Sequence, residues 1–114
     1  MAEATSRDKG VDLAIWSDSL EPFVGNPLVV EVKRRVGSPS NAEAAAAQVS
    51  NYVATAGAMW GLLLYLEGYT PSTASRVPNV LTLAVRDLIK ELRQRTFPEL
   101  IRDLRNERVH GARR

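Results

Sequence analysis

The sequence predicts an α/β domain in which a small mixed sheet is flanked by helices. Two short apolar runs, 11–16 and 27–33, flank a turn-rich loop, which favours an antiparallel pair of strands. An alanine-rich segment and a nearly continuous apolar run, 59–66, follow, which is typical of a helix that crosses over to a buried parallel strand. Leucines at helical spacing dominate the remainder of the chain.

The composition is that of an ordinary globular protein. The 114 residues, 25% charged and 45% hydrophobic, are enough for a single domain spanning 1–114. A formal charge of +2 is a weak argument for a nucleic-acid partner. The absence of cysteine excludes a disulfide framework, a cysteine-based zinc site and a thiol nucleophile, and His110 is the only histidine. The N-terminus lacks a signal pattern and the run 58–66 is too short to span a bilayer, so we expect a cytoplasmic protein without a membrane segment.

The two N-terminal apolar runs alternate as strands do. Residues 1–10 are polar and small, and we expect them to be disordered. Residues 11–16 fit a strand with Leu13 and Ile15 on one face and Asp12, Ala14 and Trp16 on the other. Residues 17–27 are rich in turn-forming residues throughout. A loop this short implies a hairpin, so Asp12 and Glu31 belong to neighbouring strands.

The next elements are a helix and a buried strand. Ser40 and Glu43 have the spacing of a capping box, and the helix is expected over about 41–56 with Gly57 as its C-terminal stop. Gln48 and Tyr52 are four residues apart and share one face of this helix. The apolar run 59–66 is then a central strand covered on both faces.

The C-terminal part reads as two helices after a loop at 67–78. One amphipathic helix is predicted by the spacing of its apolar residues and ends near Arg95; those residues are Leu81, Val85, Leu88 and Leu92. Thr96 and Glu99 offer a second capping box for the last helix. Residues 106–114 are expected to form a flexible basic tail.

Glu31 and Lys33 are the first candidates for a functional site. They are two residues apart on a strand, so their side chains point to the same face, and burying them is costly unless both charges have partners. A carboxylate can hold a hard cation such as Mg²⁺, and a lysine can stabilise a phosphate oxygen or help to deprotonate a water. The competing interpretation is a solvated ion pair on the strand surface.

The order of these polar residues resembles the PD-(D/E)XK nuclease superfamily, the restriction-endonuclease-like fold. The resemblance covers about 11–66: Asp12 on one strand, Glu31-Val32-Lys33 on the next, then Gln48 on a helix. Its most telling segment is 26–33. The chain departs from the family at Val11, where many members have proline.

The resemblance implies a site and an activity. Asp12, Glu31 and the backbone carbonyl of Val32 would bind Mg²⁺, with Mn²⁺ as a substitute, and Lys33 would position or activate the hydrolytic water. Gln48 would help to order the catalytic site. Tyr52 would contact the DNA or support Gln48. Apart from the resemblance, Arg34 and Arg35 directly follow Lys33, where the chain leaves the strand, and are expected to touch phosphates of the nucleic acid. The implied function is a Mg²⁺-dependent endonuclease that hydrolyses DNA phosphodiester bonds, and a double-strand cut would require a homodimer or a larger host complex.

Two alternatives remain open on the sequence. The first is a catalytically inactive domain of the same fold that binds nucleic acid or a partner protein. The second is an interaction module in which Leu81, Leu88 and Leu92 pair with another chain. The arginines of the C-terminal region fit either phosphate contact or salt bridges on a solvated helix.

Overall fold

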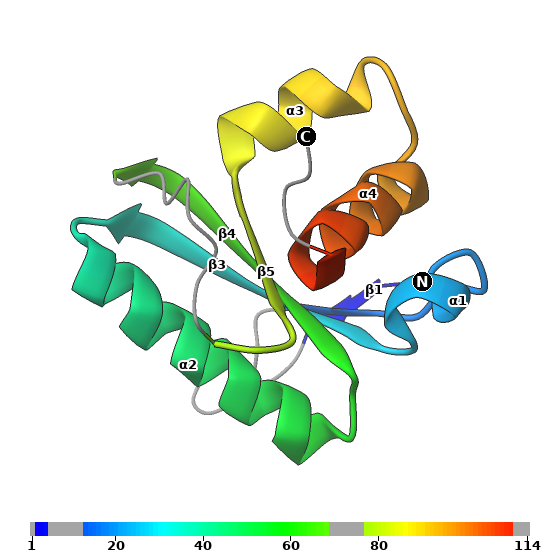
Figure 1. Cartoon of the computed structure of the whole chain (residues 1–114), viewed down its shortest axis with the longest axis horizontal. Coiled ribbons are helices and arrows are strands. Elements are labelled where there is room, and N and C mark those ends of the chain that lie inside the picture. The colour runs from blue at the N-terminus through cyan, green and yellow to red at the C-terminus, as the bar shows by residue number, and fades with distance from the viewer. Residues whose placement is uncertain (1, 5–12, 69–76, 111–114) are drawn as a thin grey trace.

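The fold was analysed in a computed structural model, which describes residues 2–4, 13–68 and 77–110. A mixed five-stranded sheet with helices on both faces forms the α/β architecture, with strand order β1-β2-β3-β4-β5 (Figure 1). In chain order the elements are β1 (Ala2–Ala4), β2 (Leu13–Ile15), α1 (Glu21–Val24), β3 (Leu28–Val36), α2 (Pro39–Ala56), β4 (Trp60–Gly68), β5 (Val80–Ala84), α3 (Val85–Leu92) and α4 (Phe97–His110).

The predicted hairpin is present as β2 and β3. The two strands are antiparallel, with Leu13 opposite Val30 and Ile15 opposite Leu28. Their connection was expected to be turns throughout, but it contains the short helix α1. Asn26 holds this connection together, because its Oδ1 accepts a hydrogen bond from the Ser17 backbone N–H at 2.9 Å while its Nδ2 donates to Glu21 Oε1 at 3.0 Å.

Helix α2 is the predicted crossover between two parallel strands. β3 and β4 pair in parallel, and α2 connects them across one face of the sheet (Figure 1). The N-cap is Ser38 rather than the predicted Ser40: the Ser38 hydroxyl accepts a hydrogen bond from the Asn41 backbone N–H at 3.2 Å. Gly57 ends the helix as predicted, in the left-handed conformation at φ +69° that favours glycine.

The sequence prediction was wrong about residues 80–84. They form strand β5, parallel to β4, and the helix α3 begins only at Val85. The leucine spacing fits a helix, but Val80, Leu81 and Leu83 lie in a short apolar run that fits a strand equally well, and pairing with β4 decides between the two. Residues 2–4, expected to be disordered, form β1 and pair with β2.

The hydrophobic core lies in two layers on either side of the sheet. On one face, Val29 and Leu63 pack against Val49 of α2. On the other face, Leu28 and Leu62 pack with Ile101 of α4, beside which α1 lies (Figure 1). The two faces of β3 are therefore assigned: Val29 marks the α2 side and Leu28 the α4 side.

Helix α4 begins with the predicted capping box. The Glu99 backbone N–H donates to Thr96 Oγ1 at 3.3 Å, and the Thr96 backbone N–H donates to Glu99 Oε1 at 2.9 Å. The helix continues to His110, so residues 106–110 of the expected tail are its last turns. The remaining four residues of that tail lie outside the described residues.

The capping box predicts a pH-dependent contribution to stability. The hydrogen bond from the Thr96 backbone N–H holds the pKa of Glu99 below its usual value. Because the pKa of Glu99 is lower in the folded state than in the unfolded state, its ionised carboxylate stabilises the fold at pH values above the unfolded-state pKa. This stabilisation is lost as the pH falls through the folded-state pKa. We expect Glu99→Gln, which keeps an acceptor at this position, to lower the melting temperature slightly at neutral pH and to match the wild type in acid. Glu107→Gln, further along the same helix, is the control for a change of net charge.

Candidate active site

Glu31 lies on the face of β3 that α2 covers. Alternation along the strand places it on the same side as Val29, which packs against α2. The residue is only 8% exposed. A carboxylate at this depth is costly unless charge or hydrogen bonds compensate for the lost water.

Lys33 supplies such compensation and also connects the sheet to α2. Its Nζ lies 3.4 Å from Glu31 Oε2 and donates a hydrogen bond to Gln48 Oε1 at 3.0 Å. The lysine side chain remains 32% exposed, against 11% for the side chain of Glu31. A partly accessible ammonium is thus fixed between a buried carboxylate and a side-chain amide from another element.

The structure brings together three of the predicted site residues and places Tyr52 nearby on the same helix. Gln48 is exposed, whereas Tyr52 is half-buried and packs against the core beneath α2. Helix geometry places Gln48 and Tyr52 one turn apart on the same edge of α2. Tyr52 therefore combines a packing role with a position beside the polar contact.

Tyr65 is a neighbour of the site that the sequence analysis missed. It lies on β4 in register with Lys33 and is 2% exposed. It packs with Ala42 of α2, which places it on the same face as Glu31 and Lys33. The sequence distinguishes Tyr65 only as the one hydroxyl-bearing side chain in the run 59–66, whereas its place beside Lys33 depends on the register of β3 with β4.

The remaining predicted residues do not take part in the two contacts that Lys33 makes with Glu31 and Gln48. Val32, Arg34 and Arg35 are exposed on the second half of β3. Val36 at the strand end packs with Ala42 and Tyr65 on the α2 side, so strict alternation from Lys33 does not extend to the end of β3. Asp12 lies outside the described residues, although β2, which follows it in the chain, is the neighbour of β3.

The donors present suit part of a magnesium site. Among residues 2–4, 13–68 and 77–110, no group of three or more histidine, aspartate or glutamate residues is arranged to hold a metal. Of the residues that the structure describes, Glu31 alone offers a buried carboxylate on this face, and Mg²⁺ commonly takes only one or two carboxylates and keeps several waters. The chemistry of Glu31 therefore fits one position in the coordination of a hard cation.

In comparisons with known proteins, the chain matches no family model, no curated protein and no solved structure. These comparisons therefore assign no function to the site. Within the part of the chain that the structure describes, no helix has the length and apolar character needed to cross a membrane.

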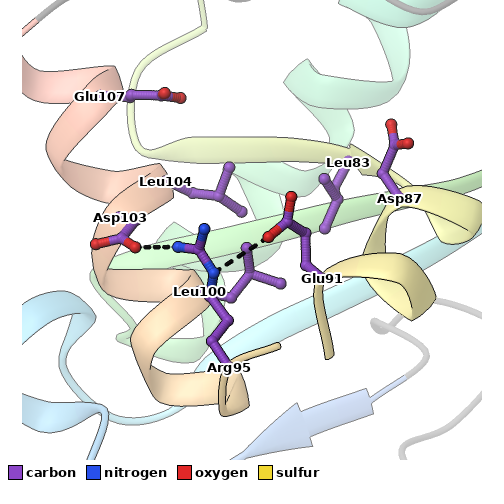
Figure 2. Close-up of a pocket in the computed structure, with 8 residues that line it drawn as sticks. All are labelled: Leu83, Asp87, Glu91, Arg95, Leu100, Asp103, Leu104 and Glu107. Atoms are coloured by element: carbon purple, nitrogen blue, oxygen red, sulfur yellow. Dashed lines mark hydrogen bonds and ion pairs between the residues drawn. The ribbon is translucent and has the colours of Figure 1, made fainter. Parts of the chain in front are cut away.

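A separate hollow of about 240 Å³ lies between α3 and α4 (Figure 2). Arg95 lies within it and forms ion pairs with Glu91, at 3.1 Å, and with Asp103. Arg95 thus links a residue of α3 to a residue of α4 through two ion pairs. The other lining residues are Leu83, Asp87, Leu100, Leu104 and Glu107. Of these, Leu83 and Leu104 pack on the core layer of Ile101, on the opposite side of the sheet from Glu31.

Proposed function

We propose that this chain is a metal-dependent nuclease of the PD-(D/E)XK type, with a restriction-endonuclease-like fold, that hydrolyses DNA phosphodiester bonds. The observation that carries the proposal is the position of the Lys33 ammonium group. It lies between the carboxylate of Glu31 on the same strand and the side-chain amide of Gln48 on α2. The antiparallel pair β2 and β3, followed by the crossover α2, is the element order that the resemblance implies.

Each residue of the proposed site has its own role in phosphodiester hydrolysis. Lys33, whose ammonium is partly exposed, positions the attacking water and stabilises negative charge that develops on the phosphate. Gln48 accepts a hydrogen bond from Lys33 and so fixes the direction in which the ammonium points. Glu31, Asp12 and the carbonyl of Val32 would hold Mg²⁺ or Mn²⁺, which when bound supplies positive charge next to the phosphate.

DNA would approach the edge of α2 at which Lys33 remains accessible, because α2 itself covers this face of the sheet. Tyr52 borders the site on α2. Arg34 and Arg35 are exposed further along β3, and since neighbouring strand residues point to opposite faces, both would meet phosphates only where DNA passes the end of the strand. Contacts of this kind are independent of sequence and weaken with salt. A homodimer, or a larger complex, would supply the second active site for a double-strand cut.

A plasmid assay tests the proposal. Purified chain is incubated with supercoiled plasmid and Mg²⁺ or Mn²⁺, and we expect nicked or linear product that EDTA suppresses. Intact plasmid with both metals, over a range of protein concentration and pH, would refute the nuclease assignment.

Metal binding can be measured without activity. We expect Mn²⁺ at ten times its dissociation constant to stabilise the wild-type chain by about 1.4 kcal/mol, since a ligand that binds only the folded state raises stability by mass action. Thermal melts with and without Mn²⁺ measure this, and Glu31→Gln should lose the increment. Asp18→Asn, in the exposed turn after β2, is the matched control and should keep it. An increment that survives Glu31→Gln would remove Glu31 from the metal site.

A further inference from the structure

Helix α3 carries an apolar stripe that the fold leaves partly open. Val85, Leu88, Ile89 and Leu92 have the spacing of one helix face, which in a globular protein normally faces the core. No residue of α3 is fully buried, and the side chains of Ile89 and Leu92 are 53% and 43% exposed. Only the half-buried Val85 and Leu88 belong to the side that faces the interior.

The sheet also has exposed apolar side chains on the face that α3 and α4 cover. Val32 pairs in register with Leu64 of β4, and alternation places Leu66 on that side as well. Leu64 belongs to the core layer that contains Leu62 and Ile101, which identifies the face as the one on which α3 and α4 lie. Val32 is 41% exposed and Leu66 50% exposed. The four exposed residues Val32, Leu66, Ile89 and Leu92 are named the α3-side apolar surface.

Charge is distributed unequally around α3. Lys90 and Arg93 are exposed and lie on the flank of the helix next to Ile89, and within the described residues neither forms an ion pair. The acidic side chains lie on the opposite flank, toward α4, where Glu91 pairs with Arg95 (Figure 2). The open edge of the apolar stripe is therefore bordered by positive charge.

We propose that the α3-side apolar surface binds an acidic amphipathic helix of a partner protein. Leucine-like side chains of the partner would cover Ile89 and Leu92, and its carboxylates would meet Lys90 and Arg93, in the manner of a helix that lays its apolar face on a complementary surface. The surface lies on the opposite side of the sheet from Lys33, so a partner there leaves the proposed active site accessible.

The charge pattern argues against one other occupant of this surface, and the type of its exposed side chains argues against a second. In an antiparallel pairing of α3 with its copy in a twofold dimer, the basic flanks would face one another and repel. Single-stranded nucleic acid is bound through aromatic platforms, whereas the exposed apolar side chains of this surface are all aliphatic.

Binding of a defined peptide tests the inference. The probe is a fluorescent amphipathic peptide of leucine and glutamate at helical spacing, with a control peptide in which lysine replaces each glutamate, and fluorescence anisotropy gives the dissociation constants. We expect the acidic peptide to bind the wild-type chain at least about tenfold more tightly than the basic peptide. Ile89→Ser with Leu92→Ser should weaken binding by about tenfold, and Lys90→Glu with Arg93→Glu should reverse the preference.

Three results would overturn the inference. They are equal affinity for the two peptides, unchanged binding by the Ile89→Ser, Leu92→Ser variant, and displacement of the peptide by an oligonucleotide. Light scattering adds a fourth: a dimer that the same double variant converts to monomer would make a second copy of the chain the occupant. We expect the variants to keep the melting temperature of the wild type, because the replaced side chains are exposed, and a thermal melt of each variant checks this.

Discussion

Lys33→Ala is expected to lower plasmid cleavage by a factor of about 10² to 10³, the usual contribution of a fixed donor that stabilises charge developing in the transition state. The ammonium lies 3.4 Å from Glu31 Oε2 and 3.0 Å from Gln48 Oε1, so its loss removes the one described cation that contacts both residues. Single-turnover cleavage of supercoiled plasmid at saturating Mg²⁺ measures the chemical step directly.

Arg34→Ala is the matched control for Lys33→Ala. It removes a positive charge from the next position of β3, where the side chain is exposed. We expect it to weaken DNA binding at most modestly and to leave the single-turnover rate at saturating DNA unchanged. The melting temperature of Lys33→Ala should fall, because Glu31 is only 8% exposed and loses the charge that compensates for its burial, so the two rates are compared at a temperature at which both proteins are folded. Equal cleavage rates for Lys33→Ala and the wild type would show that Lys33 does not take part in the reaction.

The parts of the fold that were predicted correctly depend on local signals. Turn residues between two alternating runs specify the antiparallel pair β2 and β3, and Gly57 specifies the end of α2 through its left-handed conformation. The error at β5 has the opposite origin. Leu81 and Leu83 fit either periodicity, and only the free edge of β4, a tertiary feature, makes 80–84 a strand.

The candidate site, like the fold, was predictable only where local sequence patterns determine it. A period of two residues was sufficient to place Glu31 and Lys33 on one face, whereas the contact between Lys33 and Gln48 also depends on the rotation of α2 over the sheet. Tyr65 was missed because its position opposite Lys33 is set by the register of β3 with β4, which no local pattern encodes. The metal-binding role of Asp12 stays a prediction from the resemblance, and the phosphate contacts of Arg34 and Arg35 stay predictions from their position after Lys33.

Gly61→Ala is expected to destabilise the fold by about 1–3 kcal/mol, the usual cost of overpacking a close-packed core. Gly61 lies on β4 directly beneath α2, and an added Cβ would lie 2.5 Å from Val49 Cγ1 and 2.9 Å from Val53 Cγ2. Branched valines cannot easily rotate away, so the helix has to move. Urea unfolding measures the loss of stability.

The same substitution also tests how α2 positions the proposed site. Gln48 is the neighbour of Val49 in sequence, so a shift of α2 away from Gly61 stretches the 3.0 Å contact between Gln48 and Lys33. We therefore expect cleavage to fall in Gly61→Ala even under conditions where the variant is fully folded. Gly37→Ala is the control, because its added Cβ would meet only Asn41 Nδ2, at 3.4 Å, and it should change stability by less than about 0.5 kcal/mol. If Gly61→Ala were as stable and as active as Gly37→Ala, α2 could not be seated directly on β4, and the placement of Gln48 beside Lys33 would lose its structural basis.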